Sequence, residues 1–203
     1  MKRVCIAVIL LTFVISACGP GATPEPTATP EPTPTATSEP TPEPRLLRHP
    51  TAGFELLLPG NYTFEDFSTG YDQGAVLIKD ENGNFTVMAA GVPSQGFSLS
   101  AIVGIIQMIY EQNTGLEIDT DGLQVAYTRQ FDVTLAGGEG RGFGFTGTFN
   151  GEPVEGEIFG VMMNDQDILV VISYINTGDD PDAWANTGAP NLEALLNTLK
   201  FSE

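Results

Sequence analysis

The pattern of apolar and polar positions divides the chain into an apolar start, a polar middle and a long mixed remainder. Residues 4–15 are almost uninterruptedly apolar. Residues 19–44 are nearly all Pro, Thr, Ala and Glu, with no large apolar residue to nucleate a core. Only the remainder has the strand and helix periodicity that lets a chain bury a core. We therefore expect one globular domain over residues 45–203.

Short apolar runs bounded by turn residues predict strands in both halves of this domain. The expected strands of the first half are 53–58, 61–64, 75–79 and 85–90. Those of the second half form a meander over 124–133, 139–149, 152–163 and 168–175. Asn82-Gly83 and Asn150-Gly151 lie between neighbouring runs and are typical of tight hairpin turns.

Two segments have helical spacing. The first begins at Ser98 or Ser100, ends near 113–115, and carries Leu99, Ile102, Val103, Ile106 and Ile109 on one face. Ile105 and Met108 widen that face and leave a narrow polar stripe of Ser100, Gly104, Gln107 and Glu111. The second helix places Leu192, Leu195, Leu196 and Leu199 on one face. This order of elements predicts an α+β fold, an α/β/α sandwich in which helices cover a mainly antiparallel sheet.

The start of the chain has the three parts of an export signal. Lys2 and Arg3 precede the apolar run, and Ser16-Ala17 follow it. The run is too short for a spanning helix, which needs roughly 20 residues. Ile15-Ser16-Ala17-Cys18 resembles the bacterial lipobox, which implies that the signal is cut before Cys18 and that its thiol is acylated. The alternative is an ordinary signal peptide with an incidental cysteine.

This interpretation sets the expected organisation and location. Residues 1–17 are the lipoprotein signal peptide, and 18–44 are the lipidated Cys18 with a disordered linker. Biased toward polyproline II, the linker spans up to about 80 Å. We expect the protein to be lipid-anchored to a membrane of the cell envelope, on its extracytoplasmic face.

Charge and cysteine content narrow the classes of partner and chemistry. The formal net charge of -18 argues against nucleic acid as a partner. The two cysteines are Cys5, which leaves with the signal, and Cys18, so the domain has no thiol pair for a disulfide. His49 is the only histidine. The sequence therefore predicts no catalytic triad, no metal site and no cofactor.

Layout and two short end motifs resemble the PsbP-like superfamily, which includes LpqN-type lipoproteins. The motifs are Gly53-Phe54-Glu55-Leu56-Leu57-Leu58-Pro59-Gly60 at the start of the domain and Thr198-Leu199-Lys200-Phe201 at its end. The resemblance covers nearly all of 45–203. It implies an α/β/α sandwich that serves as a binding or assembly module, and it transfers no active-site residues.

Three motifs invite chemical interpretations that their surroundings do not favour. Gly142–Gly147 matches GxGxxG, but it lies within an expected strand rather than before a helix. More simply, glycines 140, 142 and 144 leave one strand face bare for a helix or ligand to approach. Asp119–Gly122 resembles the start of a calcium loop, but position 130 is Gln rather than the required Glu. We interpret Asp119–Gly122 and the acidic cluster at 179–182 as polar turns.

The candidate interaction residues are apolar. Trp184 lies in a loop rich in Asp, Asn and Gly. It either contacts a partner, or it packs over the sheet edge or anchors the last helix. Ile105 and Met108 line a hydrophobic site if that part of the first helix is exposed.

Three functions remain open at this point. The first is a non-enzymatic binding or assembly module that meets an unidentified protein. The second is a carrier of a small apolar ligand or lipid, held between helix 99–110 and the glycine-bare strand. The third is a hydrolase that uses carboxylates such as Glu155 and Glu157, which requires two carboxyls across one cleft.

Overall fold

In a computed structural model of the chain, the structure describes residues 42–67, 74–121, 124–125 and 129–202. The strands are β1 (Arg45–His49), β2 (Phe54–Leu58), β3 (Tyr62–Asp66), β4 (Gly74–Asp80), β5 (Phe85–Pro93), β6 (Leu116–Ile118), β7 (Thr120–Asp121), β8 (Gln124–Val125), β9 (Arg129–Leu135), β10 (Gly138–Phe149), β11 (Glu152–Met162), β12 (Asp167–Asn176) and β13 (Lys200–Phe201). The helices are α1 (Leu99–Thr114), a π-helical turn η1 (Trp184–Gly188) and α2 (Ala189–Leu196). The predicted signal peptide, Cys18 and most of the linker lie outside the described residues.

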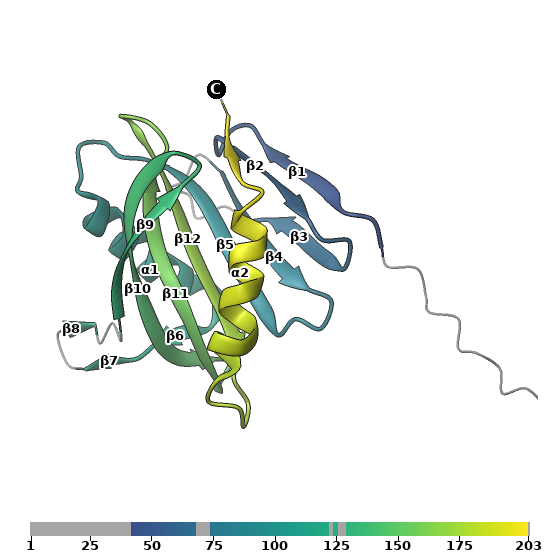
Figure 1. The fold of residues 1–203 in the computed structure, drawn as a ribbon. Helices are drawn as coiled ribbons and strands as arrows, with labels where there is room; N and C mark the ends of the chain where they lie inside the picture. Colours follow the sequence, from purple (N-terminus) through teal and green to yellow (C-terminus); the bar gives the residue numbers. More distant parts are fainter. Residues whose placement is uncertain (1–41, 68–73, 122–123, 126–128, 203) are drawn as a thin grey trace, which may run out of the picture. The chain divides into compact units, whose positions relative to one another are not determined.

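Most strands belong to one antiparallel sheet. Its order is β3-β4-β5-β12-β11-β10-β6, and β9 also pairs with β10. This sheet curls, so that β9 comes round toward the face that carries α2 (Figure 1). Strands β1, β2 and β13 form a small second sheet, and β7 pairs with β8.

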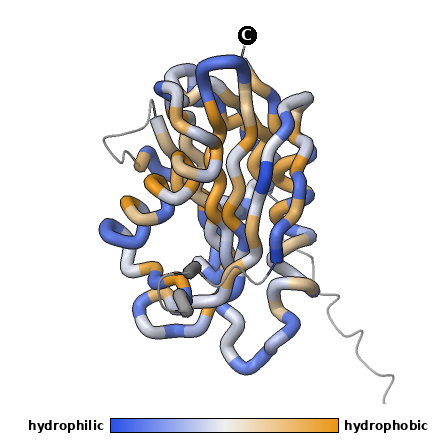
Figure 2. Tube along the Cα trace, turned by 90° about the vertical axis from the view of Figure 1, so that its left-hand side faces the viewer, coloured by the Kyte–Doolittle hydropathy of each residue, from blue (hydrophilic) through white to orange (hydrophobic). Residues whose placement is uncertain are grey.

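The curled sheet is covered on both faces, and a separate apolar cluster lies on each. On one face, α1 packs over side chains of β5, β10, β11 and β12. On the other, α2, η1 and the small sheet share the cover. Strands β5 and β12 run through the middle of the sheet and are buried along nearly their whole length. Their side chains point alternately to the two faces, and both faces are covered. Figure 2 shows hydrophobic positions along the strands in the middle of the molecule and hydrophilic positions at many of its turns.

The first helix confirms the predicted ends. Ser98 Oγ accepts a hydrogen bond from the N–H of Ala101 at 3.3 Å, and Gly115 ends the helix with φ of 81°. Its faces differ from the prediction. Gln107, expected in the polar stripe, is buried, whereas Met108 is 51% exposed. The helix is therefore rotated about its axis relative to the predicted apolar face.

Close approach of this helix to the sheet depends on Gly160 in β11. A Cβ at this position would lie 2.7 Å from Leu99 Cδ1 and 2.8 Å from Val103 Cγ2. The absence of a side chain therefore lets α1 rest directly on the strand.

The end of the chain differs from the prediction in two ways. Trp184, expected in a loop, begins the helical turn η1 that runs into α2. Leu199 follows the helix rather than lying in it, and the next two residues form β13, which pairs with β2. Thr198 extends this ladder, because its Oγ1 accepts from the N–H of Leu57 at 3.0 Å. Phe201 packs against the core.

The hairpin turns are largely as predicted. Asn150 and Gly151 have φ of 53° and 85°, which is the type I′ pattern. In the turn after β4 only Gly83 has positive φ, at 69°, so Asn82 does not use the conformation expected of it.

The first meander strand is the least accurate prediction of the sheet. One strand was predicted over 124–133. The structure instead has the two-residue strand β8 (Gln124–Val125) and the longer strand β9 (Arg129–Leu135). The reason is a turn at Ala136 and Gly137, whose φ angles are 49° and 88°. Strands β1, β6 and β7 are not predicted.

The α+β class and the mainly antiparallel sheet are confirmed. The three-layer sandwich is not confirmed, because the sheet curls and the small sheet shares one face with α2. Among the described residues, none of the helices has the length and apolar character needed to span a bilayer.

Candidate binding groove

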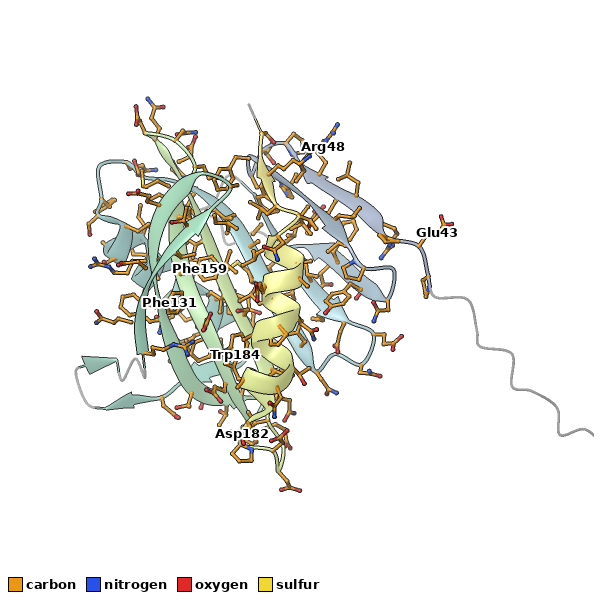
Figure 3. All side chains as sticks on the ribbon, viewed as in Figure 1. Glu43, Arg48, Phe131, Phe159, Asp182 and Trp184 are labelled. Atoms are coloured by element: carbon orange, nitrogen blue, oxygen red, sulfur yellow. The ribbon has the colours of Figure 1, made fainter. Side chains whose placement is uncertain are left out.

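A groove lies between the edge strand β9 and helix α2, and we call it the β9–α2 groove. Its volume is about 220 Å³. The lining side chains come from β9, β11, α2 and the residue after α2: Phe131, Val133, Thr134, Leu135, Glu157, Phe159, Ala189, Leu192, Glu193, Leu196 and Asn197. Figure 3 shows Phe131 and Phe159 beside α2, on the side from which β9 approaches.

The glycines of β10 allow β9 to fold toward β11. A Cβ on Gly142 would lie 2.5 Å from Phe131 Cζ and 2.6 Å from Phe159 Cβ. The two rings therefore meet across the bare strand, with centroids 6.5 Å apart and an edge-to-face angle of 62°. A Cβ on Gly140 would lie 2.0 Å from the carbonyl oxygen of Gly160. The glycine run thus permits the curl of the sheet.

This arrangement corrects one expectation. The glycines were expected to admit a helix or ligand, and the bare face instead admits the neighbouring strand side chains. Phe143 and Phe145, on the opposite face of β10, belong to the cluster under α1. Helix α1 and the bare face of Gly142 therefore lie on opposite faces of the sheet. The prediction that helix 99–110 and the glycine-bare strand enclose one ligand site is wrong.

Strand β9 supplies one wall of the groove by simple alternation. Phe131, Val133 and Leu135 are half-buried and pack against the cluster that contains α2. Gln130, Asp132 and Thr134 are exposed. One side of the strand is therefore apolar and faces a cavity, and the other is polar and faces solvent.

Carboxylates lie beside the apolar floor. Glu157 is largely buried and forms an ion pair with Arg129, whose guanidinium carbon also lies 5.7 Å from the centre of the Phe131 ring. Burial raises the pKa of Glu155, on the same strand face; Arg129 opposes this shift, and Asp182 and Glu157 add to it. Glu193 projects from α2 on the other side of the groove and is exposed. The groove is thus apolar in its middle and acidic at its borders.

Met108 and Ile105 lie on the other face of the sheet. Ile105 is half-buried and lines a cavity of about 70 Å³ with Val92, Pro93, Gln95, Phe97, Ile102 and Ile106. Phe97 is 58% exposed, and Met108, on the same helix as Ile105, is 51% exposed. The helix therefore does present apolar side chains to solvent. Whether they contact a partner stays a prediction.

Trp184 is placed in the interior. It is 4% exposed, and a Cβ on Gly188 would lie 2.3 Å from its Cε3 atom. The ring packs under η1 and joins the cluster that contains α2. Of the two roles considered for Trp184, the structure supports anchoring of the last helix, because a buried side chain offers no surface to a partner.

The remaining motifs have local roles. His49 Nδ1 accepts from the N–H of Ala52 at 3.2 Å, within the turn that joins β1 and β2. Residues Gly142–Gly147 run within β10, so no helix follows this GxGxxG sequence. Asp119 Oδ2 accepts from Thr146 Oγ1 at 2.9 Å. Among the described residues, no group of three or more acidic, histidine or cysteine side chains is placed to hold a metal ion.

The groove is not predicted by the sequence analysis, although one of its walls has a recognisable pattern. The alternation of Phe131, Val133 and Leu135 with polar neighbours is visible in the sequence. It was missed because the strand was expected to end at 133. Cys18, the expected lipidation site, lies outside the described residues, so its acylation stays a prediction.

No family model and no curated protein matches the chain. Among solved structures the chain is similar to cyanobacterial PsbP (CyanoP) from Synechocystis sp. PCC 6803, with a TM-score of 0.51 and 10% identity over 84% of this chain and 99% of that one. It is also similar to LpqN, involved in cell envelope biogenesis of Mycobacterium tuberculosis, with a TM-score of 0.45 and 14% identity over 79% and 91% of the two chains. The first similarity shows the fold alone: the domain has a PsbP-like fold, as the resemblance predicted.

Proposed function

We propose that the protein is a non-enzymatic, extracytoplasmic binding or assembly module that contacts a partner protein through the β9–α2 groove. The observation that carries this proposal is an apolar groove, open to solvent, between an edge strand and a helix. Apolar surface left exposed at such a place is typical of interaction sites.

The size of the groove favours a protein partner over a carried ligand. Pockets that enclose small molecules have volumes of roughly 300–1,000 Å³. The β9–α2 groove has about 220 Å³ and the cavity beside Ile105 about 70 Å³, so each accommodates one or two side chains of a partner more readily than a lipid. A cavity of about 420 Å³ at the turn between β9 and β10 lies within that range, but its lining includes the polar residues Glu139, Asn164 and Asp165. Carriage of a small apolar ligand is the second candidate, and it rests on the apolar lining alone.

A tether at Cys18 is the second part of the proposal. It is supported by the lipobox-like sequence and by the Pro- and Thr-rich linker that leads to β1. Cys18→Ala is expected to release the protein from the membrane fraction or to leave its signal uncut. Normal processing and membrane retention of this variant would refute the anchor.

Matched substitutions on the two faces test the partner surface. The full chain is expressed in its native host, cross-linked in intact cells and recovered from solubilised membranes. Leu196→Lys places a charge in the groove, and Met108→Lys places one on α1 at an exposed site. We expect a discrete partner that is recovered equally with wild type and Met108→Lys, and at least tenfold less with Leu196→Lys. Retention by Leu196→Lys, with loss in Met108→Lys, would contradict the proposed site.

An activity assay tests the non-enzymatic part. Glu157 and Glu193 line the groove from β11 and α2, so they are the pair to substitute with Gln. We expect no turnover from the wild type in a broad hydrolase screen. Robust turnover that either substitution abolishes would favour the carboxylate-based hydrolase.

A further inference from the structure

Strand β9 has a free edge beside the groove. It pairs with β10 over its whole length, from Arg129 opposite Gly144 to Leu135 opposite Gly138. Within the described residues, no strand pairs with its other side. Exposed edges are commonly protected by charged side chains, by Pro, by bulges or by very short length. Strand β9 has seven residues, contains no Pro, and keeps an unbroken register. Its two charged residues are paired within the domain, Arg129 with Glu157 and Asp132 with Arg141.

The turn after β9 shows which backbone groups point outward. Ala136 and Gly137 form a two-residue turn with positive φ at both positions, so Leu135 and Gly138 make a hydrogen-bonded pair across it. Bonded and non-bonded pairs alternate along an antiparallel ladder. The N–H and C=O groups of Gln130, Asp132 and Thr134 therefore point away from β10, toward the free edge.

The groove lies next to this edge, where an added strand would place its side chains. Successive side chains of a strand point to opposite faces of a sheet. An added strand would therefore direct every second side chain to the face where Phe131, Val133 and Leu135 meet Leu192 and Leu196. The remaining side chains would point to solvent on the polar side of β9.

The acidic residues around the groove favour some added strands over others. Glu193 is exposed at the border of the groove, and Glu155 and Glu157 lie on the strand that forms its floor. Arg129 is committed to Glu157. Together with the formal net charge of -18, this favours a segment with lysine or arginine near its ends.

We propose that the free edge of β9 accepts an extended segment of a partner protein as an added strand, with apolar residues at every second position and basic residues at its ends. The main chain of the segment bonds to β9, and its apolar side chains fill the groove. This inference rests on the proposed function, because it specifies how the partner occupies the same groove.

A defined peptide and a matched pair of variants test the strand addition. The probe is the capped peptide Lys-Lys-Val-Thr-Val-Thr-Val-Lys-Lys, titrated by calorimetry into the full chain in detergent. Thr134→Pro removes one outward N–H without removing a bond between β9 and β10, and Thr134→Val keeps it. We expect wild type and Thr134→Val to bind alike and Thr134→Pro to bind at least tenfold more weakly, with thermal unfolding confirming that each variant is folded.

Two changes to the peptide separate its contributions. Methylation of the peptide nitrogens on the edge that would meet β9 is expected to weaken binding at least tenfold. Replacement of all four lysines by glutamate is expected to do the same. Strand addition would be overturned if the original peptide failed to bind the wild type. It would also be overturned if Thr134→Pro bound the original peptide as tightly as the wild type does and the wild type bound the methylated peptide as tightly as the original one.

The two variants Leu196→Lys and Thr134→Pro distinguish failure of strand addition from failure of the groove as the partner surface. If Leu196→Lys loses the native partner and Thr134→Pro retains it, the groove is the binding surface and the added strand is refuted. If neither variant affects the partner, both proposals fail. A dimer of the full chain that Thr134→Pro abolishes would overturn the choice of occupant in favour of a second copy of this chain.

Discussion

The two faces of the curled sheet are covered to different degrees. Helix α1 has 16 residues, is capped at both ends and rests on Gly160, so the sheet beneath it is closed. Helix α2 has 8 residues and shares its face with the small sheet and with β9. The face with the shorter helix retains a groove of about 220 Å³, against about 70 Å³ at the edge of α1. The shorter helix and the curled sheet thus leave an open groove on one face.

Truncating one apolar side chain on each face of the sheet should give the largest difference in the free energy of unfolding. Ile106 on α1 is fully buried, so Ile106→Ala is expected to lower the free energy of unfolding by about 3 kcal/mol. Leu196 on α2 is half-buried at the groove, and Leu196→Ala is expected to cost about 1 kcal/mol or less. Urea unfolding of the full chain measures both. Equal costs would mean that the two faces are closed to the same degree.

Substituting two glycines on the α1 side by alanine should change the free energy of unfolding in opposite directions. Gly160→Ala inserts a methyl group against Leu99 and Val103, and we expect it to cost about 2 kcal/mol. Gly104 lies in α1 with no atom within 4 Å of a built Cβ, so Gly104→Ala should stabilise the helix by about 1 kcal/mol. The same unfolding measurement applies. Stabilisation by Gly160→Ala would show that α1 does not rest on β11.

The turn that leads from β9 to β10 offers a smaller test of the curl. Ala136 has φ of 49°, a conformation that costs a residue with a Cβ about 1 kcal/mol. Ala136→Gly should therefore raise the free energy of unfolding by about that amount. Gly137→Ala, at φ of 88°, should lower it. A destabilising Ala136→Gly would contradict the turn, and with it the pairing of outward groups on β9.

The smallest effect concerns Glu155, which lies on the same face of β11 as Glu157. Because burial raises the pKa of Glu155, the folded state binds its proton more tightly than the unfolded state. Stability is therefore lost as pH rises from the ordinary glutamate pKa through the raised one. Glu155→Gln removes this loss, so its melting temperature should gain more relative to wild type at pH 7 than at pH 4. An equal difference at both pH values would contradict the shifted pKa.

Local features of the fold were predictable because they depend on neighbouring residues. Ser98 and Gly115 end α1 through their own backbone and side-chain chemistry, and Asn150-Gly151 specifies a turn by its tolerance of positive φ. The rotation of α1 that buries Gln107 depends on the sheet beneath it, and spacing alone does not reveal it.

The groove was not predictable for a related reason. It exists because Phe131 crosses Gly142 to reach Phe159, and because α2 comes from the far end of the chain to lie beside them. The sequence shows a strand with bare glycines, but not which element approaches the bare face. Trp184 illustrates the same limit, since its acidic and Gly-containing surroundings indicate a loop while its packing under η1 is a tertiary contact.

Site-specific photo-cross-linking in the native host shows whether the β9–α2 groove is the surface that contacts a partner. A photoreactive residue is placed at Val133 in the groove or, as the matched site, at Met108 on α1. We expect one discrete protein adduct from Val133 and none from Met108. An adduct from Met108 alone would contradict this expectation and would place the interaction surface on the helix.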